Sequence, residues 1–270
     1  MDSEVIDFPD LRLEIQGALA TIVLNDPGRL NAISKDMATS LVAALREIAK
    51  PRRGVRCLML TGEARGFCAG VNMVETRSTA ESAKGPPPLR LVETLINPMI
   101  RVIKEVSVPI VAAVNGPCVG VGVVLALLAD HVIASDQAYF LLPYRNLATC
   151  CDAGITWLLP RAIGSRRARQ MLLRAERVSA ETALTWGLVD DVVPEADFRA
   201  AARTVACEFA EGPTVALSLM RRLLIESDGT SFDAQLEAEA RGVRITARTK
   251  DNAAGIRAFG SRTKPVFIGA

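Results

Sequence analysis

The sequence predicts a layered α/β core followed by a C-terminal helical appendage. Short apolar segments rich in β-branched residues recur through the first two-thirds of the chain, whereas the last third has the apolar spacing of helices. Two of the early segments also run directly into glycine-rich turns, as buried strands of α/β proteins often do. The 270 residues, half of them hydrophobic, suffice for one large unit, which we divide into a core at 1–197 and a helical region at 198–270.

The first elements follow from alternation and helical spacing. Residues 11–15 alternate in polarity, residues 16–17 form a turn, and residues 18–24 continue as the second strand of an antiparallel hairpin. Ser34 is expected to cap a helix, because apolar residues then recur at helical spacing until Pro51.

Two later stretches each combine a strand with a glycine-rich turn. Residues 55–61 lead into the turn at 62–73, and residues 110–114 lead through Gly120 and Gly122 into an apolar helix. A strand, a turn and a helix start leave backbone N–H groups free at the positive end of the helix dipole, where an anion or an oxygen that becomes anionic can bind. No third glycine and no Gly-Lys-Ser/Thr follow, so neither a dinucleotide fingerprint nor a P-loop is present. From the residues alone, a purely structural turn and an oxyanion site are equally supported.

The remaining segments are predicted from the same patterns. Residues 76–88 are small, polar and proline-rich and predict a loop that could act as a lid. The other predicted elements are a helix at 89–106, strands at 131–134 and 139–141, helices at 155–159, 165–174 and 179–187, a strand at 189–193, and helices at 198–211, 213–227, 231–250 and 252–259.

Composition excludes several functional classes. A net charge of +2 argues against nucleic acid as a partner, and no apolar run reaches the ~18 residues of a membrane span. The first residues lack the basic and apolar regions of a signal peptide, so we expect a cytoplasmic protein. The six cysteines form no Cys-x-x-Cys pair and His131 is the single histidine, so no metal site is predicted. His131 lies in an apolar strand and is expected to be structural, which disfavours Ser–His–Asp and Cys–His catalysis.

Four motifs, in order, carry a family resemblance: residues 25–32, 66–73, 109–130, and 177–181 with 186–189. Together they resemble the crotonase (enoyl-CoA hydratase/isomerase) superfamily over nearly the whole chain. The resemblance implies an α/β crotonase-like spiral of ββα units with a C-terminal helical trimerisation region, hence a homotrimer or a dimer of trimers. It also implies an acyl-CoA thioester as substrate and no separate cofactor, since CoA is part of that substrate.

The resemblance assigns an oxyanion hole to the two glycine turns. The backbone N–H groups of Val71 and Val121 stand where family members bind the thioester oxygen and stabilise an enolate. The two glutamates that hydratases use correspond to Val124 and Tyr144, and neither residue can act as a carboxylate base.

Asp152 is the remaining candidate base. Residues 152–161 are similar to the segment that carries the catalytic aspartate of phenylacetate-pathway-type enoyl-CoA isomerases. A single carboxylate suits an isomerase, because it takes a proton from one carbon and returns it to another. The alternative is that Asp152 caps the helix that follows.

Other residues are implied to contact the substrate. Tyr144 could form a wall of the acyl pocket or donate a hydrogen bond, and the wall is the favoured role. Cys150 and Cys151 are expected to pack rather than to act as nucleophiles. Arg29, Arg262 and Lys264 match CoA-contacting positions, with an ordinary solvated surface as the alternative. The full set of implied substrate contacts is Arg29, Leu30, Ala69, Asn72, Met73, Gly120, Tyr144, Arg262 and Lys264.

The sequence therefore predicts an enoyl-CoA isomerase that shifts a β,γ double bond to the α,β position. The alternatives are an acyl-CoA-binding homologue with little or no catalysis, which the loss of both glutamates supports, and an enoyl-CoA hydratase.

Overall fold

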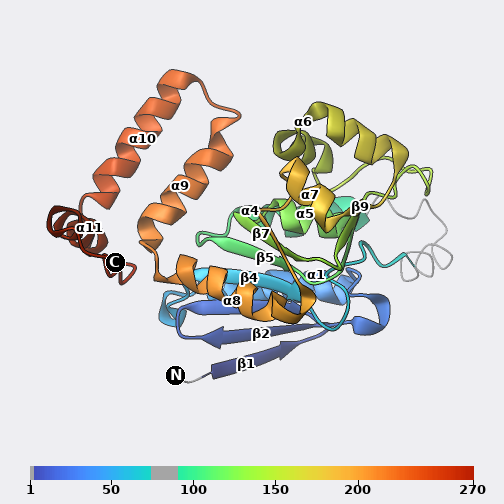
Figure 1. The fold of residues 1–270 in the computed structure, drawn as a ribbon, viewed down its shortest axis with the longest axis horizontal. Helices are drawn as coiled ribbons and strands as arrows, with labels where there is room; N and C mark the ends of the chain where they lie inside the picture. Colours follow the sequence, from blue (N-terminus) through green and yellow to red (C-terminus); the bar gives the residue numbers. More distant parts are fainter. Residues whose placement is uncertain (1–2, 74–90) are drawn as a thin grey trace.

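The computed structural model describes residues 3–73 and 91–270 and shows a mixed sheet of seven strands (Figure 1). The strand order is β1-β2-β3-β4-β5-β7-β10, antiparallel from β1 to β3 and parallel from β3 onward. The bounds are β1 (Ser3–Phe8), β2 (Leu11–Gln16), β3 (Leu19–Leu24), β4 (Cys57–Gly62), β5 (Ile110–Val114), β7 (His131–Ser135) and β10 (Asp191–Val193). The predicted hairpin is confirmed as β2 and β3. The sequence analysis did not predict β1, an edge strand in which no side chain is fully buried.

A second sheet of three strands lies beside the first and has the order β6-β8-β9. Its strands are β6 (Pro117–Val119), β8 (Tyr139–Leu141) and β9 (Val178–Ser179). β6 occupies a segment that the sequence analysis treated as part of a turn, because asparagine and glycine precede it and its first residue is proline.

The period of two along the strands gives the main sheet two apolar faces. On β4, Leu58 and Leu60 pack into the larger core under α1, whereas Cys57 and Met59 face α8. Ser34 caps α1 as predicted, and its hydroxyl accepts a hydrogen bond from the Met37 N–H at 2.9 Å. The helices that cover these two faces are α1 (Lys35–Ile48), α4 (Asn97–Lys104) and α8 (Glu195–Glu211).

Helix α8 belongs to the layered core, although the sequence analysis placed it in the C-terminal region that starts at residue 198. Its buried residues Phe198, Ala202, Ala206 and Ala210 recur every four positions and pack on the sheet. The small side chains of the three alanines let the helix lie close to the strands. The region that projects from the core therefore begins after Gly212.

The remaining elements connect these layers and continue to the C-terminus. They are η1 (Pro27–Arg29), η2 (Pro51–Arg53), η3 (Val92–Ile96), α5 (Val121–Leu127), α6 (Ile155–Arg174), α7 (Ala180–Trp186), α9 (Thr214–Ser227), α10 (Phe232–Thr246) and α11 (Lys250–Ser261). α6 covers both helices predicted at 155–159 and 165–174, and a kink at Gly164, whose φ is +77° and whose backbone is not helical, separates them. No helix in the described ranges is long and apolar enough to cross a membrane.

Residues 213–270 form a C-terminal arm of three helices that projects from the core (Figure 1). Large apolar side chains are exposed along it: Met220, Leu224, Phe232, Val243, Ile256 and Phe259. Exposed apolar surface on this scale is typical of a protein–protein interface.

Candidate active site

The two glycine-rich turns predicted from the sequence lie side by side. Cys68 forms an isolated parallel bridge with Cys118. The Cys68 N–H donates to the Pro117 carbonyl at 3.1 Å, and the Val119 N–H donates to the Cys68 carbonyl at 2.9 Å. The turn after β4 therefore runs parallel to β6, directly before the start of α5.

Glycine is required where these turns approach one another. A Cβ added at Gly122 would lie 2.5 Å from the Cys68 carbonyl oxygen, closer than a real contact allows. A Cβ at Gly70 would lie 3.3 Å from the Val119 carbonyl oxygen. Gly70 and Gly120 also have φ angles of +95° and +54°, in a region that favours glycine.

Val71 and Val121, whose backbone N–H groups are the predicted oxyanion donors, lie on these two turns. Ile33 bridges Val71 in parallel fashion, with the Ile33 N–H on the Gly70 carbonyl and the Asn72 N–H on the Ile33 carbonyl. In this pattern, the N–H of Val71 itself points away from Ile33. Val121 is the first residue of α5, so its N–H has no acceptor within the helix. Both amides are thus free of the backbone ladders on either side of them.

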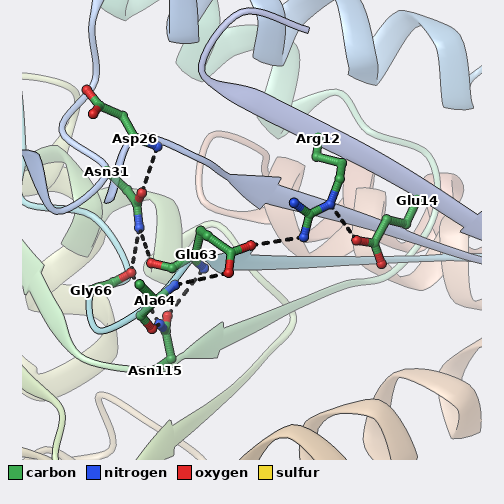
Figure 2. A network of polar contacts seen from close by, with 9 residues as sticks. Arg12, Glu14, Asp26, Asn31, Glu63, Ala64, Gly66 and Asn115 are labelled. Carbon is green, nitrogen blue, oxygen red and sulfur yellow. Dashed lines mark hydrogen bonds and ion pairs between the residues drawn. The ribbon is translucent and has the colours of Figure 1, made fainter. Parts of the chain in front are cut away.

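Two asparagines, buried Asn31 and half-buried Asn115, hold the first turn in place, and the sequence analysis did not single them out (Figure 2). The Asn31 side chain is fully buried and its Nδ2 donates to the carbonyls of Glu63 at 3.0 Å and Gly66 at 2.7 Å. Asn115 donates to the same Gly66 carbonyl at 3.2 Å and to Ala64 at 2.8 Å. The Gly66 carbonyl therefore accepts hydrogen bonds from both asparagines, Asn31 before α1 and Asn115 after β5. The turn is thereby held from two sides.

An ion-pair network extends from this turn across the sheet (Figure 2). Arg12 lies between Glu14 at 2.7 Å and Glu63 at 2.9 Å. The Arg12 hydrogen bond lowers the pKa of the Glu63 carboxyl below its ordinary value, against the opposing effect of partial burial. Glu63 is therefore a structural carboxylate at neutral pH.

The structure brings most of the predicted substrate contacts to this end of the sheet. The Leu30 carbonyl accepts the Ala69 N–H at 3.0 Å, so the loop that carries Arg29 lies against the first glycine turn. Arg29 is exposed and pairs with Asp26 at 3.0 Å. Asn72 is buried and Met73 is exposed, directly after Val71. The lid predicted at residues 76–88 and the start of the helix predicted at 89–106 lie outside the described residues.

The candidate base is hydrogen-bonded to Tyr144, whose hydroxyl donates to Asp152 Oδ1 at 2.8 Å. Tyr144 follows β8, and the Leu141 carbonyl at the end of β8 accepts the Gly120 N–H at 2.9 Å. The segment that carries Tyr144 therefore starts beside the second glycine turn. Tyr144 is only 8% exposed, and its hydroxyl donates to Asp152, so it makes the hydrogen bond that the sequence analysis gave as the alternative, while its role as a pocket wall stays a prediction.

Asp152 does not cap α6. The helix begins at Ile155, and the capping position is Gly154, with φ +82° and no side-chain capping bond. Asp152 contributes only its backbone carbonyl to the helix start, accepting the Ile155 N–H at 3.1 Å. Ala153 between them has φ +53°, a strained value for alanine. The Asp152 carboxylate therefore accepts a hydrogen bond from Tyr144 instead of capping the helix.

Arg262 and Lys264 are not part of this cluster within one chain. The tail that follows them reaches Arg56, whose guanidinium donates to the Phe267 carbonyl at 3.3 Å. Arg56 directly precedes β4, whereas the first glycine turn follows its other end. The six residues of β4 span about 20 Å at ~3.3 Å per residue. Figure 1 likewise shows α11 and the C-terminus on the side of the core away from α5.

The histidine is structural, as predicted. His131 Nε2 lies 2.9 Å from an Asp191 carboxylate oxygen, joining neighbouring strands β7 and β10. The expectation that Cys150 and Cys151 pack is wrong for Cys150, which is exposed, whereas Cys151 is half-buried. Burial raises the pKa of Cys68 to about 12, and burial with Cys150 and Asp152 nearby raises that of Cys151, so both remain thiols at neutral pH.

The chain is similar to known proteins over nearly its whole length. The family model for enoyl-CoA hydratase/isomerase matches residues 14–270. The chain is 34% identical to the 1,2-epoxyphenylacetyl-CoA isomerase of Escherichia coli, over 94% of this chain and 97% of the relative. It is also 34% identical to a probable enoyl-CoA hydratase of Rhodobacter capsulatus, over 98% and 100%. The solved structure of an enoyl-CoA hydratase/isomerase from Cupriavidus metallidurans superposes with a TM-score of 0.88 at 28% identity, covering 96% of each chain.

Proposed function

Because the chain belongs to the enoyl-CoA hydratase/isomerase family of crotonase enzymes, which act on CoA thioesters, we propose that it is an enoyl-CoA isomerase. The reaction would move the double bond of a β,γ-enoyl-CoA to the α,β position. The observation that carries this proposal is the carboxylate of Asp152, held by Tyr144 and not used to cap a helix.

In the proposed mechanism, the thioester oxygen accepts hydrogen bonds from the N–H groups of Val71 and Val121. Asp152 removes a proton from the α carbon, and the electron pair moves onto the thioester oxygen as an enolate. The two amides stabilise this charge, which is greater in the transition state than in the bound substrate. The protonated Asp152 then delivers its proton to the γ carbon, the double bond settles between the α and β carbons, and the carboxylate is regenerated.

Neither of the two positions at which hydratases carry a glutamate holds a carboxylate in this chain. Val124 is fully buried in the core and carries no ionisable group. Burial and the neighbouring Asp152 raise the pKa of Tyr144 well above its ordinary value, so its hydroxyl stays protonated and cannot activate water at neutral pH.

The CoA moiety is proposed to extend past Arg29. Since Arg262 and Lys264 lie at the other end of β4 in their own chain, we assign them to the CoA site of a neighbouring subunit in a trimer or a dimer of trimers. The exposed apolar side chains of the C-terminal arm support such an assembly.

Two parallel assays test the reaction. A β,γ-enoyl-CoA is followed for formation of the conjugated thioester, and an α,β-enoyl-CoA is followed for loss of conjugation through hydration. Isomerisation without hydration supports the proposal. Hydration at comparable or greater rate would assign a hydratase, and tight acyl-CoA binding without either reaction would assign a binding protein.

A further inference from the structure

We propose that Tyr144 is a positioning residue that acts through Asp152, holding one carboxylate oxygen so that the other is presented to the substrate proton. The inference rests on the proposed isomerase function and adds a role for a residue that stands where hydratases carry a glutamate. The hydroxyl of Tyr144 lies 2.8 Å from Asp152 Oδ1.

The direction of this hydrogen bond is set by the protonation states. An ionised carboxylate can only accept, so the Tyr144 hydroxyl is the donor. Its raised pKa keeps it a donor throughout the neutral range and prevents it from exchanging roles with Asp152. Within the part of the chain that the structure describes, this is the hydrogen bond that the Asp152 carboxylate accepts from a side chain.

Tyr144 is more firmly packed than Asp152, so the tyrosine can orient the carboxylate. Tyr144 is buried among the core side chains, whereas Asp152 is only half-buried and is followed by two residues with left-handed backbone, Ala153 and Gly154. A half-exposed carboxylate with no partner can change its side-chain rotamer. A fixed hydroxyl on one oxygen removes that freedom and leaves the second oxygen oriented, as proton transfer requires.

Loss of the hydrogen bond should also have a signature in the pH profile of the reaction. A donor on the charged form favours that form, so its removal shifts the protonation of the base to higher pH. The titratable groups that interact with this pair in the described ranges are Tyr144, Asp152 and Cys151. The raised pKa of Cys151 keeps that thiol neutral across the range in which a carboxylate titrates, so it adds no competing step.

The test is Tyr144→Phe, with Tyr139→Phe as the matched control. Tyr139 is the other tyrosine of the chain, lies on β8 a few residues earlier, and stacks with Arg177 at 4.4 Å through its ring, which the control retains. For Tyr144→Phe we expect kcat to fall about tenfold, because the base is less well oriented. KM should stay within about twofold, and the acid limb of the kcat profile should move up by roughly half to one pH unit. Tyr139→Phe should change none of these quantities.

The pH at the midpoint of the limb does not depend on how much of the enzyme is folded, so loss of stability in Tyr144→Phe leaves the test intact. A raised KM with unchanged kcat and an unmoved limb would make Tyr144 a pocket wall and overturn the inference. Unchanged kinetics would overturn it as well.

A double variant separates this inference from the proposed function. If Tyr144 acts through Asp152, adding Tyr144→Phe to Asp152→Asn should cause no further loss of turnover. A further tenfold loss would contradict the inference. If Asp152→Asn alone retains wild-type turnover, the proposed function itself fails. If Asp152→Asn is inactive and Tyr144→Phe is normal, only the role of Tyr144 fails.

Discussion

Arg221 on helix α9 forms an ion pair with Asp130, with Nε 2.8 Å from Oδ2, where the C-terminal arm meets the core. The same guanidinium donates to the backbone carbonyls of Lys104, Val106 and Leu128, and the arginine is only 7% exposed. Two of these carbonyls lie at the C-terminal ends of α4 and α5, where a positive charge is favourable. One side chain thereby attaches the arm to the C-terminal ends of α4 and α5.

Replacing Arg221 with Leu should lower the free energy of unfolding by about 3 kcal/mol, because it leaves the Asp130 carboxylate and three carbonyls without their partner. Arg222→Leu is the matched control, since its neighbouring side chain is exposed and lies 3.9 Å from Glu226. The control should change stability by less than about 0.5 kcal/mol. Chemical denaturation of both variants measures the difference, and equal effects would contradict the anchoring role of Arg221.

Substitutions at Val71 should separate the backbone from the side chain of the proposed oxyanion hole. Val71→Ala retains the N–H and should leave turnover within a few-fold. Val71→Pro removes the N–H and should reduce turnover by about a hundredfold or more, the usual effect of losing one oxyanion donor. Turnover is compared after circular dichroism shows that both variants are folded. If both lose the same activity, the amide is not the functional group.

Asp152→Asn should reduce isomerase turnover at least about a hundredfold, because the amide retains the shape of the carboxylate and loses its basic oxygen. The Tyr144 hydroxyl can still donate to the amide oxygen, so the local geometry is preserved. Affinity for acyl-CoA should change little, and solvent-deuterium exchange at the acidic carbon of the substrate should fall together with turnover. A variant with wild-type turnover would refute the mechanism.

The C-terminal arm should assemble into a trimer or a dimer of trimers. Light scattering at micromolar concentration should give a mass that is a multiple of three chains, and a monomer would refute the prediction. Leu224 and Phe259 are 72% and 90% exposed in the single chain. Replacing either with Asp should weaken the assembly while leaving the core folded, because a charge would then have to be buried in the apolar contact. Thr204→Asp, on the exposed side of α8, is the control and should leave the mass unchanged.

Strands and turns with a clear local sequence pattern were predicted correctly from the amino-acid sequence. Alternating apolar residues predicted the β2–β3 hairpin, and β-branched runs followed by glycines predicted both strand–turn segments of the candidate site. The four ordered motifs indicated the family, and the segment at 152–161 pointed to Asp152. These features depend on neighbours within a few residues, so they can be recognised without the fold.

Contacts between segments that are far apart in the sequence became visible only in the folded chain. The pairing of Cys68 with Cys118 joins segments far apart in sequence, and nothing local specifies that contact. The loop that brings Asp152 back to Tyr144 has left-handed backbone at Ala148, which alanine does not signal. The alanine-rich α8 resembles an ordinary surface helix until its face is placed on the sheet. Contacts over long sequence separations arise from packing and closely fitting backbone, which no single segment encodes.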